Sequence, residues 1–192
     1  MRKFLLIAFA ATTLSACGIN SVPTAEEEAK GRWADVENNY QRRADLVPNL
    51  VATAKGFAAQ EREVLEAVTQ ARASATQVNL DPGDLTDPAQ MQQYAAAQDQ
   101  LSGALSRLLV TVERYPELRS NESFLTLQQQ LEGTENRIAI ARRDYNAAVQ
   151  AYNTEVRTFP GLIAARYIYD AEPMQPYEAT TAGAEEAPRV EF

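Results

Sequence analysis

The sequence contains no histidine and only one cysteine, Cys17, among its 192 residues. The missing histidine removes the commonest general base and the commonest metal ligand of proteins. A single cysteine excludes an internal disulfide framework and a thiolate metal cluster. The sequence also lacks a glycine-rich phosphate loop, a GxSxG nucleophile motif and a metal-ligand cluster. These absences predict a protein that is not an enzyme and that binds no cofactor or metal.

Basic residues are also scarce. The 18 lysines and arginines are outnumbered by 26 acidic residues, which gives a formal net charge of −8. An acidic surface is a poor partner for nucleic acid and for an anionic lipid face. Hydrophobic residues make up 45% of the chain, so we expect one globular domain with a substantial core.

The start of the chain has the pattern of a targeting segment. Two basic residues precede an apolar run of 11 residues, 4–14, and the tetrapeptide Leu-Ser-Ala-Cys ends at Cys17. A helix of that length reaches about 16 Å, roughly half of a bilayer core of about 30 Å, which favours a signal peptide over a spanning helix. The tetrapeptide resembles the bacterial lipoprotein box, in which cleavage leaves an acylated cysteine. We predict a signal peptide at residues 1–16 and a lipid-anchored tether at 17–23; the alternative is an ordinary signal peptide that ends near a cysteine.

Apolar residues at steps of three and four predict long amphipathic helices over most of the remaining chain. No strand pattern of useful length is present. The expected elements are a first rod from Thr24 to Val78 that opens with a Thr24–Glu27 capping box, a helix opened by Asp87-Pro88 and ended by Pro116, a helix from Asn121 to Phe159 capped by Ser120 or Asn121, and a short piece from Leu162 to Tyr169. Each apolar stripe must be buried against the others, so the fold class is all-α, an antiparallel bundle of three to four long helices at residues 24–169. Residues 170–192 lack helical periodicity and are interpreted as a C-terminal tail, partly ordered at most.

Pro48 interrupts the first rod. A proline inside a helix removes one hydrogen bond and clashes with the carbonyl four residues back, here that of Ala44. The helix therefore either bends and continues, or ends near Arg43 and restarts with Asp45 as its N-cap. The apolar stripe resumes in phase at Leu50 and reaches Phe57, but the rod is longer than its partners. We predict a rod that is bent or broken near Pro48, and four helices in total.

Four polar residues around this proline, Arg42, Arg43, Asp45 and Asn49, form a candidate interaction site. They could bind an anion or a protein partner. The simpler interpretation is an ion pair between Arg42 and Asp45, with both arginines near the carbonyl-rich end of a helical segment. Asn39 and Asn49 would then cap the backbone groups that the proline frees.

The third helix carries a run of charges that we interpret as a solvated face. A hydrolase would need Glu132 or Glu135 in an acid pair, and nothing in the spacing brings two carboxylates together in a cleft. The tyrosines on the stripes are expected to lie in the core with their hydroxyls at its edge; they are Tyr40, Tyr94, Tyr115, Tyr145 and Tyr152. Gln98 is the one polar member of the second helix's stripe.

Residues 39–51, NYQRRADLVPNLV, resemble the N-terminal signature of the LemA family of bacterial envelope proteins. Residues 124–131, 141–146 and 188–192 are similar to later parts of the family pattern. The resemblance implies a helical bundle attached to a membrane, with most of the protein outside the cytoplasm, and implies no activity. Many relatives have an N-terminal transmembrane helix where this chain has its lipobox, which favours a lipid anchor here. Gly18 after the cysteine fits outer-membrane delivery if the source has two membranes.

We therefore expect a non-enzymatic lipoprotein of the cell envelope that faces the periplasm or the exterior. It would contact the membrane through its N-terminal lipid and act as a scaffold or adaptor for envelope proteins. The alternative is a membrane-organising or membrane-remodelling protein whose amphipathic helices open onto the bilayer. The sequence leaves a homo-oligomer open.

Overall fold

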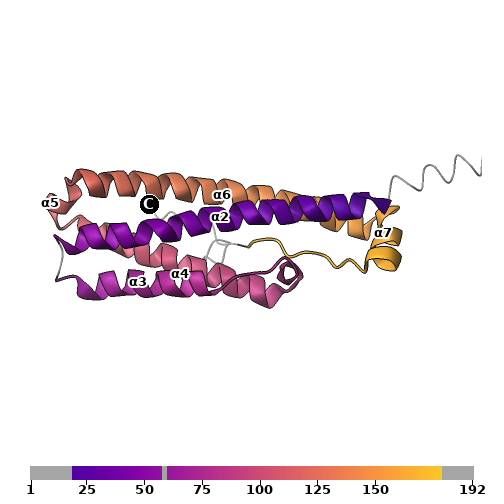
Figure 1. The fold of residues 1–192 in the computed structure, drawn as a ribbon, viewed down its shortest axis with the longest axis horizontal. Helices are drawn as coiled ribbons and strands as arrows, with labels where there is room; N and C mark the ends of the chain where they lie inside the picture. Colours follow the sequence, from indigo (N-terminus) through magenta and orange to yellow (C-terminus); the bar gives the residue numbers. More distant parts are fainter. Residues whose placement is uncertain (1–18, 58–59, 179–192) are drawn as a thin grey trace, which may run out of the picture.

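The computed structural model describes residues 19–57 and 60–178, which form an elongated bundle of antiparallel helices (Figure 1). Its four long helices are α2 (Ser21–Lys55), α3 (Arg62–Gln77), α4 (Pro88–Val112) and α6 (Glu122–Arg157). Short elements join or follow them: a 3-10 turn at Asp84–Thr86, α5 (Pro116–Arg119), α7 (Gly161–Ala164) and a π turn at Ala165–Tyr169. The described residues contain no strand. The all-α class and the antiparallel bundle are thus confirmed.

Two of the expected helix starts are confirmed by their caps. Asp87 Oδ1 accepts hydrogen bonds from the N–H groups of Ala89 and Gln90, and Pro88 occupies the first turn of α4. Asn121 Oδ1 accepts from the N–H of Phe124 at the start of α6. The capping box expected at Thr24 is wrong.

The first helix begins earlier than expected, so Thr24 lies inside it and is not its N-cap. α2 starts at Ser21, inside the segment expected to be a tether, and Asn20 provides no side-chain cap. Thr24 Oγ1 instead donates to the backbone oxygen of Asn20, at 2.7 Å. The hydroxyl therefore satisfies a carbonyl of the preceding turn, a common role for threonine within a helix.

The first rod is interrupted at residues 56–61 and not at Pro48, which lies inside α2. The carbonyl of Ala44, which loses its helical partner at Pro48, accepts a hydrogen bond from Arg72 Nε of α3 at 2.8 Å. The neighbouring helix thus replaces the missing backbone donor, so the helix need not end. The four long helices are confirmed. Of the two alternatives at Pro48, the helix that continues is confirmed, and the break at the proline is not. Phe57, expected on the apolar stripe, is 39% exposed in the turn after α2.

The core has two parts that share α2, α4 and α6. The first part joins the N-terminal half of α2 to the C-terminal half of α6, and includes the expected tyrosines Tyr40, Tyr94, Tyr145 and Tyr152. The second lies among α3, α5, the C-terminal half of α2, the later part of α4 and the start of α6. Tyr115 differs from the other tyrosines. It is half-buried, and its hydroxyl donates to Glu61 Oε1 at 2.7 Å.

Residues 171–178, here called the strap, follow α7 and run back along the bundle (Figure 1). Met174 and Tyr177 of the strap are each 3% exposed and belong to the first core. The amide side chain of Asn153 accepts from the N–H of Met174 and donates to its carbonyl, and Asn146 does the same for Tyr177. An asparagine side chain offers an NH₂ donor group and a carbonyl acceptor, so it can bond the C=O and the N–H of one residue at the same time. The first eight residues after Asp170, in the segment expected to be a partly ordered tail, are thus packed against the bundle, while residues 179–192 lie outside the described part.

The expected signal peptide and Cys17 also lie outside the described residues. Among residues 19–57 and 60–178, no helix combines the length and the apolar character that crossing a membrane requires.

Candidate functional site

The structure separates the residues of the candidate interaction site, because Arg43 alone points into the bundle. Its side chain is 1% exposed. Nη1 donates to Glu135 Oε1 at 3.0 Å and to Ser102 Oγ at 2.7 Å. Nη2 donates to both the backbone oxygen and Oε1 of Gln98, at 3.0 and 2.9 Å. We call Arg43, Gln98, Ser102 and Glu135 the Arg43 centre.

The Arg43 centre connects all four long helices. Gln98 Nε2 donates to the carbonyl of Ala75 near the end of α3, at 3.2 Å. The guanidinium carbon of Arg43 also lies 4.8 Å from the centroid of the Tyr40 ring, a cation–π distance. A buried charge is tolerated only where hydrogen bonds and an opposite charge compensate for lost hydration, and these contacts supply both. Arg43 is therefore a structural residue of the bundle.

The centre lies at the level where the two parts of the core meet. On α2, the first part ends at Tyr40 and the second begins at Val47. The other buried polar side chains of the described residues at this level are Gln98 of α4 and Thr134 of α6, whose Oγ1 donates to the carbonyl of Gln130. A polar layer thus crosses the bundle between two apolar halves.

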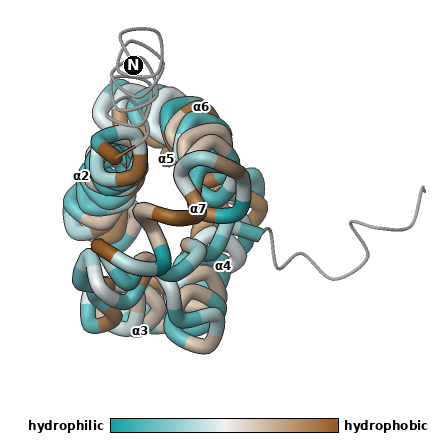
Figure 2. The backbone as a smooth tube through the Cα atoms, turned by 90° about the vertical axis from the view of Figure 1, so that its right-hand side faces the viewer, coloured by the Kyte–Doolittle hydropathy of each residue, from teal (hydrophilic) through white to brown (hydrophobic). Residues whose placement is uncertain are grey.

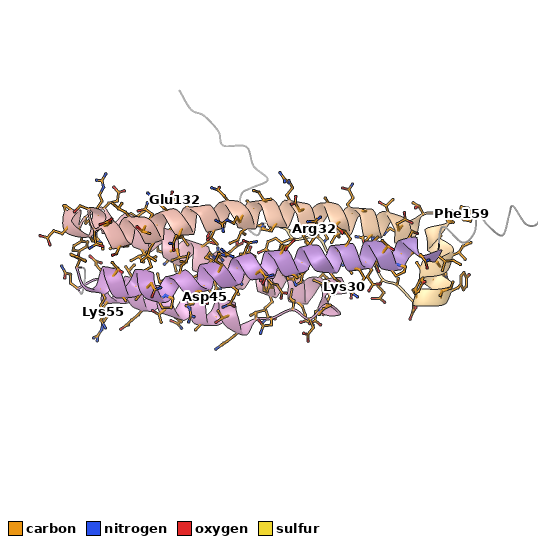
Figure 3. All side chains as sticks on the ribbon, turned by 45° about the horizontal axis from the view of Figure 1, so that its top comes forward. Lys30, Arg32, Asp45, Lys55, Glu132 and Phe159 are labelled. Carbon is orange, nitrogen blue, oxygen red and sulfur yellow. The ribbon has the colours of Figure 1, made fainter. Side chains whose placement is uncertain are left out.

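Arg42, Asp45 and Asn49 lie on the outer side of α2, and we call them the α2 face. All three are exposed, and steps of three and four residues place them on one side of a helix (Asp45 is labelled in Figure 3). The expected Arg42–Asp45 pair does not form, since Asp45 accepts a hydrogen bond from Gln41 Nε2 at 2.8 Å.

The side chains of the α2 face do not bond the backbone carbonyl that Pro48 leaves without a donor. Within the described residues, Arg42 makes no hydrogen bond or ion pair, and the side chain of Asn49 makes no hydrogen bond. The expected caps by Asn39 and Asn49 are therefore wrong: Asn39 donates to the carbonyl of Asp35, and Arg72 satisfies the carbonyl at Pro48.

A cleft of about 230 Å³ opens between α2, the end of α3 and α4. Its polar lining residues include Glu37, Gln41, Thr76, Asn79 and Tyr94. Burial raises the pKa of the Glu37 carboxyl, the Trp33 indole N–H opposes that rise, and the charge of Asp81 adds to it. Trp33 Nε1 is buried without a hydrogen bond of ordinary length, so its contact with Glu37 is a weak one. Only one carboxyl group lines the cleft.

The expected solvated face of α6 does not supply an acid pair. Glu132 accepts a hydrogen bond from Gln128, whereas Glu135 is held by Arg43. The described residues also contain no group of three or more side chains that could hold a metal ion.

The strap completes an aromatic cluster next to the Arg43 centre. The hydroxyls of Tyr40 and Tyr177 are 2.7 Å apart, and Arg142 lies 4.1 Å from the centroid of the Tyr177 ring. Burial raises the pKa of Tyr40, Tyr94 and Tyr177 above the usual tyrosine value. Sequence reasoning missed Tyr177 because the strap has no periodicity. The signal that could have found it is the pair of asparagines seven residues apart on α6.

The chain is similar to proteins of one known family. Residues 32–192 match the LemA family. The chain is 29% identical over 171 residues to magnetosome protein MamQ 2 of Paramagnetospirillum magneticum, which covers 81% of this chain and 62% of that protein. MamQ of Magnetospirillum gryphiswaldense is 28% identical with the same coverage. Protein LemA of Metamycoplasma hominis is 22% identical over 140 residues, 73% of this chain and 60% of that protein. The chain thus matches about three-fifths of the length of these relatives.

Proposed function

Because the chain belongs to the LemA family, we propose that it is a non-enzymatic protein of the cell envelope that holds protein partners at a membrane. A lipid on Cys17 would provide the attachment. The partners would bind the α2 face. Family membership and the lipobox-like sequence support the attachment to a membrane of the cell envelope. The exposed polar residues of the α2 face support the binding of protein partners.

The observation that carries the scaffold role is the contrast between Arg43 and the α2 face. The bundle uses Arg43 internally, whereas the side chains of Arg42 and Asn49 make no hydrogen bond inside the described part of the chain. Polar side chains that are exposed and unpaired are available to a partner without breaking a contact of the bundle. A long bundle whose helices are cross-connected at the Arg43 centre would hold such a surface in a fixed orientation.

The partner-binding part is tested by replacing Arg42, Asp45 and Asn49 together with alanine in cells. Envelope proteins that crosslink to the native chain should no longer do so. The matched control replaces Arg62 and Glu66, an exposed ion pair on α3, and should keep the crosslinks. If the crosslinked proteins are the same in both variants, the α2 face is not the docking surface.

The lipid anchor is tested separately by a Cys17→Ser substitution. We expect the chain to leave the membrane fraction, because one acylated residue would supply the attachment. Unchanged fractionation would refute the lipid anchor and leave the scaffold role to be judged by the crosslinks.

A second candidate function is membrane organisation by helices that open onto the bilayer. Its support is the similarity to proteins named as magnetosome proteins and the four amphipathic helices. Such opening would expose the amides of the core to exchange with solvent deuterium when the full Cys17→Ser chain is mixed with vesicles. Unchanged protection of the Tyr145–Val156 amides would favour the closed bundle and contradict this candidate.

A further inference from the structure

One end of the bundle gathers the exposed apolar side chains of the molecule. Among the described residues, seven of eleven exposed large hydrophobic side chains lie there: Ile19, Phe159, Leu162, Ile163, Tyr167, Ile168 and Tyr169. Phe159 and Tyr167 are the most exposed, at 78% and 77%. Six of these residues are called the α7 end: Phe159, Leu162, Ile163, Tyr167, Ile168 and Tyr169.

The α7 end has the reverse of the usual amphipathic arrangement. The buried residues of this segment are small: Gly161, Ala164 and Ala165. A Cβ atom on Gly161 would collide with the backbone oxygen of Glu155, so the segment lies tightly against the last turns of α6. The large apolar side chains consequently point outward. A segment that served only to cover the core would bury its large side chains and expose its small ones.

The position of the α7 end relates it to the start of the chain. α7 lies beside the N-terminal end of α2, as the end-on view shows (Figure 2). Phe159 marks the same end of the bundle in Figure 3. The chain that precedes residue 19, with the apolar run 4–14 and Cys17, therefore joins the bundle here. Attachment through Cys17 would bring this end of the bundle to the bilayer surface.

The chemistry of this end suits the interface of a bilayer. Tyrosine favours the headgroup region, where its apolar ring and its polar hydroxyl are both accommodated. Phenylalanine and leucine insert at the boundary between headgroups and acyl chains. Arg157 and Arg166 are exposed here, and the Arg166 guanidinium lies 6.0 Å from the Tyr167 ring centroid. Such arginines can reach lipid phosphates while their stems contact apolar surface.

Acidic groups near this end are largely compensated. Glu26 and Glu28 of α2 pair with Lys30 and Arg32, at 2.7 and 2.8 Å. Asp170 is the one exposed acid between residues 157 and 170. Two exposed arginines, Arg157 and Arg166, accompany this acid, so the segment repels an anionic lipid face less than the net charge of the molecule implies.

We propose that the α7 end is a membrane-contacting surface whose side chains enter the headgroup region of the bilayer. The contact is additional to the lipid on Cys17 and rests on the membrane attachment in the proposed function. It orients the bundle with α7 at the membrane and with α5 away from it. The α2 face then lies above the bilayer, on the side of the helix bundle that remains in water.

Photo-crosslinking in the full chain tests this contact. A photoreactive phenylalanine analogue is placed at position 159 or 167 and the chain is expressed in cells. The matched controls carry it at Val110 or Leu125, which are 71% and 42% exposed and lie beside α5 at the opposite end. Phospholipid adducts, identified by mass spectrometry, are expected at 159 and 167 and not at 110 and 125.

Other crosslinking results would overturn the contact. Adducts at 159 and 167 with residues 1–18 of the same chain, or with a second copy, would show that another occupant covers this surface. Equal lipid labelling at both ends, or none, would also reject it. Membrane fractionation of the same samples separates the two proposals: a chain in the membrane fraction without lipid adducts fails only the α7 contact, and a chain outside that fraction fails both.

Discussion

Arg42 and Arg43 are neighbours in the sequence with opposite environments. Arg42 turns to solvent and has no partner among the described residues, whereas Arg43 is buried with four hydrogen bonds. A helix rotates by about 100° per residue, so adjacent positions can lie on different faces. Which of the two is buried depends on the Glu135 and Gln98 side chains that face it from other helices. The same residue type thus has a structural role at one position and is available for binding at the next.

The first prediction compares the two arginines. Arg43→Met should lower the free energy of unfolding by about 2–4 kcal/mol, since it leaves Gln98 and Ser102 without their charged partner while Glu135 can still reach water. Arg42→Met, the matched control, should change it by less than about 0.5 kcal/mol. Urea titrations followed by circular dichroism measure both. Equal effects of the two substitutions would contradict the assignment of roles.

The second prediction concerns pH and Glu37. Burial raises the pKa of its carboxyl above the ordinary value of 4.5, so the folded state disfavours the charged form. This contribution to stability is fully present below that value and is lost as the pH rises through the raised pKa of the folded state. Glu37→Gln should therefore stabilise the protein at neutral pH, by less than about 1 kcal/mol because the group is half-exposed, and should have no such effect in acid.

Thermal unfolding across this pH range measures the effect of Glu37→Gln. Glu66→Gln, at an exposed position of α3, is the control and should keep the native pH dependence. Destabilisation by Glu37→Gln at neutral pH would show that the carboxylate has a favourable partner.

At the scale of the helices, Pro48 and Arg72 act together. The proline leaves the carbonyl of Ala44 without its N–H partner, and Arg72 Nε fills that place from α3. This contact supplies the donor that the proline removes, from a residue 28 positions away in the sequence, and α2 continues through the proline to Lys55.

The third prediction is a double-mutant cycle. Arg72→Ala should cost about 1–2 kcal/mol in the native chain, because a carbonyl loses its donor. In a Pro48→Ala background the new N–H can bond the carbonyl of Ala44, so the same substitution should cost about 1 kcal/mol less. Chemical denaturation of the four proteins gives the coupling. Additive effects would mean that Arg72 does not replace the missing donor.

The strap is held by hydrogen bonds from side chains of α6, which cannot be predicted from the sequence of the strap. Asn146 and Asn153 lie two turns apart on α6, and each binds both backbone groups of one strap residue. Tyr145 and Tyr152 add their hydroxyls to the carbonyls of Gln175 and Glu172. The strap therefore binds α6 mainly through its backbone, which leaves its sequence free of a recognisable pattern.

The fourth prediction follows from these amide contacts. Asn146→Ala should expose the amide of Tyr177 to hydrogen exchange, and Asn153→Ala should do so for Met174. Each substitution should cost about 1–3 kcal/mol, since it leaves a donor and an acceptor of the strap unpaired. Asn38→Ala, at an exposed position of α2, serves as the control. Exchange that stays slow at both strap positions would contradict the contacts.

At the scale of the whole molecule, the bundle has two apolar halves with a polar layer between them. The strap belongs to one half, and α3 belongs to the other. α2, α4 and α6 run through both halves, so these three helices carry the connection between them (Figure 1). The strap completes one half and α3 completes the other. Removing the strap therefore tests whether the two halves unfold independently.

The fifth prediction uses a chain that ends at Asp170. Removal of Met174 and Tyr177 opens the first half, so amides of Tyr145–Val156 should lose protection from hydrogen exchange. Amides of Leu101–Val112 in the second half should keep most of theirs, because α3 still covers them. Mass spectrometry of peptides from both halves measures the difference. Equal loss would show that the bundle unfolds as one unit.

The sequence by itself determined the class of the fold, the long helices and the caps at Asp87 and Asn121, because apolar periodicity and capping are local properties of the chain. It also pointed to the LemA family. Only the tertiary structure decided that Arg43 is internal, that α2 passes through Pro48 and that the strap completes the core. Each of these depends on a partner far along the chain: Glu135, Arg72 and Asn146. Hydrogen bonds between distant residues leave no period in a sequence, so they become visible only when the helices are packed.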